Sequence, residues 1–203
     1  VEDYLRPIVA GIKSKDRPCF ITELGCMYYG KSIYGDNRGP SKYEATIAEA
    51  ELIVRGLNLG IDGFLKWVYM FNTEELRGHY HLLSRANGSY TPKHGFYGYV
   101  TLCRYFPKKA SVLKTITQGT ANLWAAALES ADRDMTVLMV NDHPSNTIEV
   151  EISPLPVSGT FYQVAFDNWM ENSITKVSES ANGSITVTIP PLGITVLTTM
   201  QAD

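Results

Sequence analysis

The two halves of this chain of 203 residues carry different sequence patterns, and this contrast limits how the chain can fold. Up to residue 107, apolar residues at helical spacing alternate with short apolar runs, in the order helix, strand, helix, strand, helix. From residue 108 onward the chain shows only short apolar runs separated by turn signals, which is the pattern of strands. We therefore expect two domains, an α/β part at 1–107 and an all-β part at 108–203.

The α/β half contains a signal for each of its elements. One helix is expected around Leu5–Ile12, and a second begins at Ser41, where Ser-Lys-Tyr-Glu forms a capping box. The expected strands are Cys19–Glu23 and Gly63–Tyr69, and the helix between them predicts parallel pairing. Because two parallel strands do not form a stable sheet alone, this half is expected to be part of a larger structure.

The end of this half is expected to hold a hairpin and a last helix. Asn87-Gly88 is a strong signal for a tight turn, and it lies between the runs HYHLL and SYTP. The pair Thr91-Pro92 is typical of a helix start, and the helix should continue to about Phe106.

The all-β half contains about eight candidate strands separated by turn residues. Every second residue is apolar in two of them, which is typical of strands with one buried face. Their number and spacing predict an antiparallel β-sandwich. The candidate strands are Val112–Thr117, Asn122–Glu129, Met135–Asn141, Thr147–Ile152, Thr160–Phe166, Ser173–Val177, Ser184–Ile189 and Thr195–Met200.

The composition argues against several functions. The formal net charge is -3 and 19% of the residues are charged, so nothing favours binding to nucleic acid. No apolar run approaches the roughly 20 residues that span a membrane. The cysteines and histidines lack the spacing of a metal site, and no organic cofactor is indicated. Asn87 and Asn182 lie in Asn-Gly-Ser sequons, which permit glycosylation but are also turn signals.

Glu23 is the most informative single residue, because it places a charge at the end of an apolar strand. It lies in the run PCFITELGC between Pro18 and Cys26. Strict alternation would put Cys19, Ile21 and Glu23 on one face, the interior of a barrel. Either the strand aims this carboxylate into a site, or Glu23 is a solvated residue that starts a loop.

These segments resemble the end of the (β/α)8-barrel glycoside hydrolases that retain anomeric configuration. ITELG is similar to their strand seven, which ends in a glutamate nucleophile. GFLKWVYMF is similar to strand eight, which ends near a tryptophan that floors the sugar site. RYFPKKASVL, followed by strands, resembles the passage from the last barrel helix into a C-terminal β-sandwich. Families 30, 39 and 79 share this layout.

The resemblance implies that Glu23 is the nucleophile of a double displacement. Retaining hydrolysis needs a second carboxyl group about 5 to 5.5 Å away, as the acid and base. In these enzymes that group comes from strand four, often in an Asn-Glu pair, and no such pair ends a strand here. The chain is therefore expected to be the C-terminal portion of a longer enzyme, whose upstream half supplies the acid. Glu74 or Glu75 as an acid within this chain is the less favoured alternative.

Further residues are expected to contact the sugar. Aromatic rings pack on the C–H face of a pyranose, and the loop after Glu23 is rich in tyrosine. On the second strand, alternation groups Trp67 with Tyr69, whereas Lys66 either points to the helices or enters the site. The predicted substrate-binding residues are Trp67, Tyr28, Tyr29, Tyr69 and Asn72.

The predicted function is that of the C-terminal portion of a retaining O-glycosidase. Its partners would be a carbohydrate and the upstream half of the barrel, in the same precursor or as a separate chain. Its location would be extracellular, lysosomal or secretory. Trp124 and Trp169 are interpreted as core residues, or else as exposed sugar-binding rings. The alternatives are a non-catalytic carbohydrate-binding or structural β-sandwich protein with a degenerate barrel remnant, and a barrel in which Glu23 abstracts a proton.

Overall fold

The structure is a computed structural model that describes residues 2–25, 42–66, 69–71, 82–86, 88–92, 94–155, 159–166, 172–178 and 183–201. Its helices and strands follow the two patterns of the sequence, with mixed α/β elements first and strands afterwards. In this described part, no helix is both long and apolar enough to cross a membrane.

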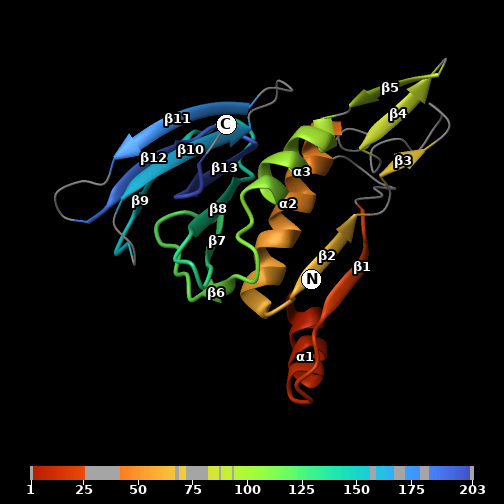
Figure 1. Cartoon of the computed structure of the whole chain (residues 1–203), viewed down its shortest axis with the longest axis horizontal. Helices are drawn as coiled ribbons and strands as arrows, with labels where there is room; N and C mark the ends of the chain where they lie inside the picture. Colours follow the sequence, from red (N-terminus) through yellow and green to blue (C-terminus); the bar gives the residue numbers. More distant parts are fainter. Residues whose placement is uncertain are drawn as a thin grey trace.

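The first half is built around a parallel strand pair and two helices. β1 and β2 pair in parallel, as the sequence predicted, and α2 packs on one face of the pair. α3 lies beside α2, and both helices separate the strand pair from the large sheet of the second half (Figure 1). The bounds are α1 (Glu2–Lys13), β1 (Phe20–Leu24), α2 (Lys42–Leu59), β2 (Gly63–Lys66) and α3 (His94–Arg104).

The second half forms a six-stranded sheet and a separate two-stranded sheet. The order of the large sheet is β11-β10-β13-β8-β7-β6, and all its neighbours are antiparallel. β9 pairs with β12, also antiparallel. The bounds are β6 (Ser111–Leu113), β7 (Leu123–Glu129), β8 (Met135–Asn141), β9 (Ile148–Ile152), β10 (Thr160–Phe166), β11 (Asn172–Ser178), β12 (Ile185–Ile189) and β13 (Gly193–Thr198). The predicted mixed class with antiparallel sheets is confirmed.

A small sheet between β2 and α3 corrects one prediction. β4 (Leu83–Ala86) pairs in parallel with β3 (Met70–Phe71) and makes a hairpin with β5 (Ser89–Pro92). The predicted turn is present, and Gly88 takes a φ of 82°, which favours glycine. Thr91-Pro92 does not start the helix, because both residues pair with β4 and α3 begins at His94. Proline is tolerated there since β5 is an edge strand.

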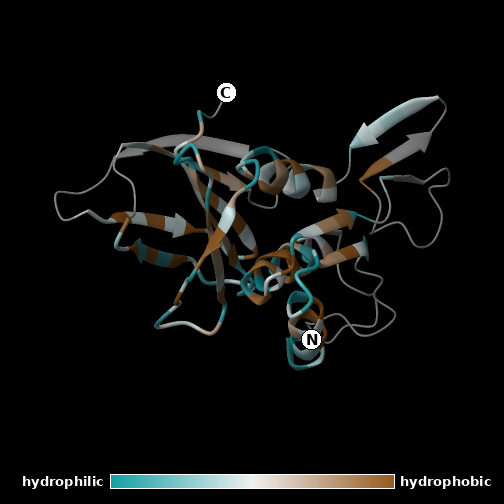
Figure 2. Cartoon of the chain, turned by 60° about the horizontal axis from the view of Figure 1, so that its bottom comes forward, coloured by the Kyte–Doolittle hydropathy of each residue, from teal (hydrophilic) through white to brown (hydrophobic). Residues whose placement is uncertain are grey.

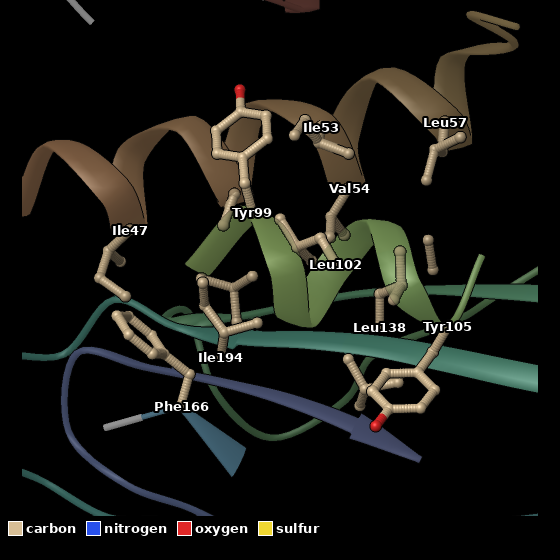
Figure 3. Packing of buried hydrophobic residues seen from close by; sticks show 14 of the residues in the cluster. Ile47, Ile53, Val54, Leu57, Tyr99, Leu102, Tyr105, Leu138, Phe166 and Ile194 are labelled. Atoms are coloured by element: carbon tan, nitrogen blue, oxygen red, sulfur yellow. The ribbon is translucent and has the colours of Figure 1, made fainter. Parts of the chain in front are cut away.

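One hydrophobic cluster joins both halves of the chain. α2 and α3 cover one face of the six-stranded sheet, and their apolar side chains interdigitate with those of the sheet (Figure 3). Phe166 and Ile194 of the sheet have no exposed surface, and Val54 of α2 has none either. Partly buried Ile21 and Phe64 pack against the same cluster, so α2 is in contact with both strand systems. The core therefore runs through α2 from one sheet to the other.

A second cluster lies on the opposite face of the six-stranded sheet. There, Val137, Met139 and Leu197 pack against Ile185 and the other buried side chains of the β9–β12 pair. Every second residue of β12 is buried, and alternating hydropathy is visible along this strand pair (Figure 2). The large sheet is thus covered by helices on one face and by two strands on the other.

Two helical glycines should respond oppositely to alanine. A Cβ at Gly98 would lie 2.3 Å from Thr46 Cγ2 and 3.5 Å from Ile194 Cδ1, whereas one at Gly11 would have no atom within 4 Å. We expect Gly98→Ala to destabilise the protein by about 1–3 kcal/mol through overpacking. Gly11→Ala should stabilise it by about 0.5–1 kcal/mol, because alanine favours the helix. Urea denaturation measures both, and equal stability of the two variants would contradict the close contact of α2 with α3.

Candidate active site

An irregularity in β1 determines where Glu23 points. Phe20 pairs with Gly63 and Ile21 with Phe64, but the next matched pair is Leu24 with Lys66. β1 therefore has one residue more than β2 between these pairs, which is a β-bulge. Bulges disrupt the alternation of side chains and redirect them, and they are common next to active sites.

The bulge exposes Glu23 and corrects the predicted faces of β1. Cys19 and Leu24 are 7% and 2% exposed, and Ile21 packs with Cys19 beside the helices. Phe20 is 53% exposed and Glu23 is also exposed. The prediction that Cys19 and Ile21 share the face of Glu23, with Phe20 toward the helices, was wrong. Regular alternation would have put Glu23 against the helices, and the extra residue turns it away from them.

β2 continues the face on which Glu23 lies. Phe64 packs against the helix cluster, whereas Leu65 is 52% exposed. The ring of Phe20 lies over Gly63, where an added Cβ would be 2.7 Å from Phe20 Cδ1. We call the side of the strand pair that carries Phe20, Glu23 and Leu65 the open face. Glu23 places a charged side chain on this face beside the apolar side chains of Phe20 and Leu65.

Lys66 points to the helices and not into the open face. Its Nζ lies 2.6 and 2.7 Å from the two carboxylate oxygens of Glu49 on α2. Both side chains are buried, at 9% and 3% exposure, so this ion pair is shielded from water. Of the two alternatives that the sequence left open, the helix-facing one is correct. Lys66 is opposite Leu24, so the pair fixes β2 directly beside the bulge.

Tyr99 of α3 completes this buried cluster. Lys66 Nζ lies 5.3 Å from the centre of the Tyr99 ring, a cation–π distance. The Tyr99 hydroxyl points away from the six-stranded sheet (Figure 3). Burial raises the pKa of Tyr99 well above its ordinary value, and the charge of Glu49 raises it further. The phenol is therefore neutral, and the charges of Lys66 and Glu49 balance each other.

Asp62 holds the beginning of both strands. Its Oδ2 accepts a hydrogen bond of 2.6 Å from the Cys19 amide, and Lys13 Nζ of α1 donates to both of its oxygens. The Asp62 amide in turn donates to the Cys19 carbonyl. Burial raises the pKa of Asp62, but Lys13 and the Cys19 amide outweigh this effect and the net pKa is lowered. Asp62 is therefore ionised at neutral pH and links α1, β1 and the start of β2.

Of the other predicted site residues, the structure describes Tyr69 and Trp124. Tyr69 follows β2 and is 58% exposed. Trp124 is half-buried against the main cluster, donates from Nε1 to Asp142 at 2.9 Å and carries the Arg55 guanidinium 4.2 Å from its ring centre. These contacts favour packing over sugar binding for Trp124. Trp67, Tyr28, Tyr29, Asn72, Glu74, Glu75 and Trp169 lie outside the described residues.

Sequence reasoning did not find Glu49, and it did not find the bulge. Glu49 stands between two alanines on a helix that is apolar on several sides, which is the one local signal of a buried charge. Within the described ranges, no group of three or more His, Cys, Asp and Glu residues is arranged to hold a metal ion.

Removal of one member of the Lys66–Glu49 pair should be more harmful than removal of both. We expect Lys66→Met to reduce the free energy of unfolding by about 3–5 kcal/mol, because it leaves a buried carboxylate without its ammonium. The double variant with Glu49→Leu should recover much of this loss. Arg6→Ala, which breaks an exposed pair with Glu2, should change stability by less than about 1 kcal/mol. A denaturant double-mutant cycle tests this, and additive effects would contradict coupling.

No protein-family model and no curated protein sequence matches the chain. Solved structures do match it. The catalytic domain of family 30 xylanase C from Talaromyces cellulolyticus superposes with a TM-score of 0.70 at 15% identity, over 90% of this chain and 40% of that one. A family 30 subfamily 8 xylanase from Clostridium acetobutylicum gives 0.69 at 12%, over 92% and 43%. A family 30 endoxylanase from Clostridium papyrosolvens gives 0.67 at 12%, over 95% and 44%.

These likenesses concern the fold, because the identities are low. Nearly all of this chain superposes, yet it spans less than half the length of each of these xylanase structures. The resemblance that the sequence predicted is confirmed at this level: the chain has the fold of a C-terminal part of a family 30-like glycoside hydrolase.

Proposed function

We propose that this chain is the C-terminal portion of a retaining glycoside hydrolase with Glu23 as its nucleophile. The observation that supports this proposal best is the bulge, which turns Glu23 onto the open face beside the end of a parallel strand. Barrel enzymes keep their catalytic groups at the carboxyl ends of their strands, and a strand holds a nucleophile more rigidly than a loop does.

In the proposed reaction, Glu23 forms and then loses a covalent bond to the sugar. Its carboxylate attacks the anomeric carbon, the bond to the leaving oxygen breaks, and the acid carboxyl protonates that oxygen. The same group, now a carboxylate, takes a proton from water as the water attacks the anomeric carbon and releases Glu23. The acid and base group is expected outside this chain. Neither step needs a metal or an organic cofactor.

The proposed substrate is a carbohydrate held by aromatic and amide side chains near Glu23. Tyr69 is exposed after β2, where its ring is available to pack on a sugar. Trp67 would supply the sugar platform, and Tyr28, Tyr29 and Asn72 would be further sugar contacts. Xylan is the first substrate to test, since the three matched structures are named as xylanases. A polymer of this kind agrees with an extracellular or secretory location.

We further propose that residues 108–203 form an appended β-sandwich. The β9–β12 pair packs face to face on the six-stranded sheet through the second cluster, which supports two layers. The alternative function is a non-catalytic carbohydrate-binding or structural protein with a degenerate barrel remnant. The position of Glu23 near the carboxyl end of a parallel strand, on the open face, favours the catalytic proposal.

Glu23→Gln should abolish turnover in the assembled enzyme and leave sugar binding intact. The amide keeps the shape of the carboxylate but is a poor nucleophile, so kcat should fall by roughly a thousandfold or more. Glu151→Gln, at an exposed carboxylate on β9, is the matched control and should keep full activity. An activated fluorinated glycoside should add one glycosyl group to the peptide that contains Glu23, as detected by mass spectrometry. Near-normal turnover by Glu23→Gln would refute the assignment.

The proposed partner is the polypeptide that supplies the other strands of the barrel. β1 and β2 pair only with each other among the described strands, and parallel sheets are normally covered on both faces. Phe20 and Leu65 place large apolar side chains on the open face, which leaves hydrophobic surface for a partner strand layer.

The chain without this partner should therefore bind a hydrophobic dye at the open face. Leu65→Asp should lower the fluorescence of bound anilinonaphthalene sulfonate and any self-association seen by analytical ultracentrifugation. Ile116→Asp changes a side chain that is 69% exposed in the segment after β6 and is not part of the open face, so it should change neither signal. Equal signals from Leu65→Asp and the parent chain would argue against the open face as the partner surface.

A further inference from the structure

We propose that a hollow at one end of the six-stranded sheet is a second site, which binds a neutral oligosaccharide. It is formed by the turn between β7 and β8, the start of β10 and the residues after β13. α2 and α3 separate this sheet from the strand pair that carries Glu23 (Figure 1). The hollow is therefore distinct from the open face and goes beyond the proposed catalysis.

The walls of the hollow are held by hydrogen bonds within the protein. In the turn, the Ser130 amide donates to the Asp134 carbonyl at 2.9 Å, and the Asp134 amide donates to Ser130 Oγ at 3.1 Å. On the adjacent strand end, Thr199 accepts from the Met135 amide through Oγ1 and donates from its own amide to the Met135 carbonyl, both at 2.9 Å. A ligand would thus meet a preformed surface, which reduces the entropy lost on binding.

The lining is polar and includes one aromatic ring. Tyr162 on β10 is half-buried and supplies a flat apolar face with one hydroxyl. Arg133 and Asp134 are the charged residues of the lining, and both a guanidinium and a carboxylate form hydrogen bonds with sugar hydroxyls. The Arg133 guanidinium is held 2.8 Å from Glu129 Oε1. Hydroxyl and amide groups come from Thr160, Thr199 and Gln201.

This combination of groups matches the chemistry of a sugar. Each sugar hydroxyl can both donate and accept a hydrogen bond, so it can donate to the Asp134 carboxylate and accept from the Arg133 guanidinium. A pyranose also has an apolar face for a tyrosine ring. The volume is about 470 Å³, within the range of about 300–1,000 Å³ for small-molecule sites. Arg133 and Gln201 are exposed, so a longer chain can extend beyond the hollow.

Nuclear magnetic resonance titration of the full chain tests the site directly. Xylohexaose and cellohexaose are the probes, added to millimolar concentration. We expect amide shifts concentrated at Arg133, Thr160 and Thr199. Tyr162→Ala should raise the Kd about tenfold, because it removes the aromatic face. Gln201→Ala, at an exposed position, should weaken binding without any risk to the fold.

Two matched controls make the outcomes distinct. Tyr90→Ala removes a tyrosine that is 55% exposed on the β4–β5 hairpin and should leave the Kd unchanged. Glu23→Gln should leave the shifts at the hollow unchanged, so failure of the catalytic proposal would not affect this result. Shifts confined to the neighbours of Glu23, or absent with both probes, would overturn the second site. Unchanged affinity in both Tyr162→Ala and Gln201→Ala would overturn it as well.

Discussion

The position of α2 between two sheets is the constraint on which the rest of this structure depends. A helix in an ordinary globular protein buries one stripe and exposes the other. α2 instead packs against the β1–β2 pair on one side and the six-stranded sheet on the other. Asn58 near its end donates to the Ala125 carbonyl of β7 at 2.8 Å, which adds a polar link to the apolar contact. Because one helix supports both sheets, the two halves share a core.

The open face gains its geometry from three fixed points around β1 and β2. Asp62 ties the beginnings of the strands together, Lys66 anchors the end of β2 to α2, and the bulge lies between these anchors. The strand segment that carries Glu23 is thus held by Asp62 at the start of the strand pair and by Lys66 at its end. The charged groups that provide this support pair with residues of the helices and do not lie on the open face. This separation of the supporting charges from the Glu23 carboxylate agrees with the proposed hydrolysis.

Local sequence patterns predicted most of the fold. Met135–Asn141 and Thr160–Phe166 were predicted with the bounds that the structure gives, because turn residues delimit these apolar runs clearly. The parallel pairing followed from the helix between the strands. The resemblance of ITELG and GFLKWVYMF to barrel strands predicted the fold that the superposed xylanases share.

The details of the candidate site depend on contacts that no local pattern contains. The run FITEL alternates regularly, so the bulge follows only from its register against β2. Lys66 is 17 residues from Glu49, and nothing near either residue identifies the other as its partner. Thr91-Pro92 has the composition of a helix start, but pairing with β4 overrides that preference. In each case tertiary contact decides between two locally acceptable conformations.

The long connection between β1 and β2 has a consequence for how the molecule assembles. Cys19 and Asp62, which join the two strand starts, are 43 residues apart, whereas β7 and β8 are joined by the tight turn at Ser130–Asp134. Closing the longer loop loses more chain entropy, so the strand pair should form after the hairpins of the large sheet. The carboxylate of Glu23 is therefore expected on a strand pair that forms after these hairpins, with α2 as the helix on which it packs.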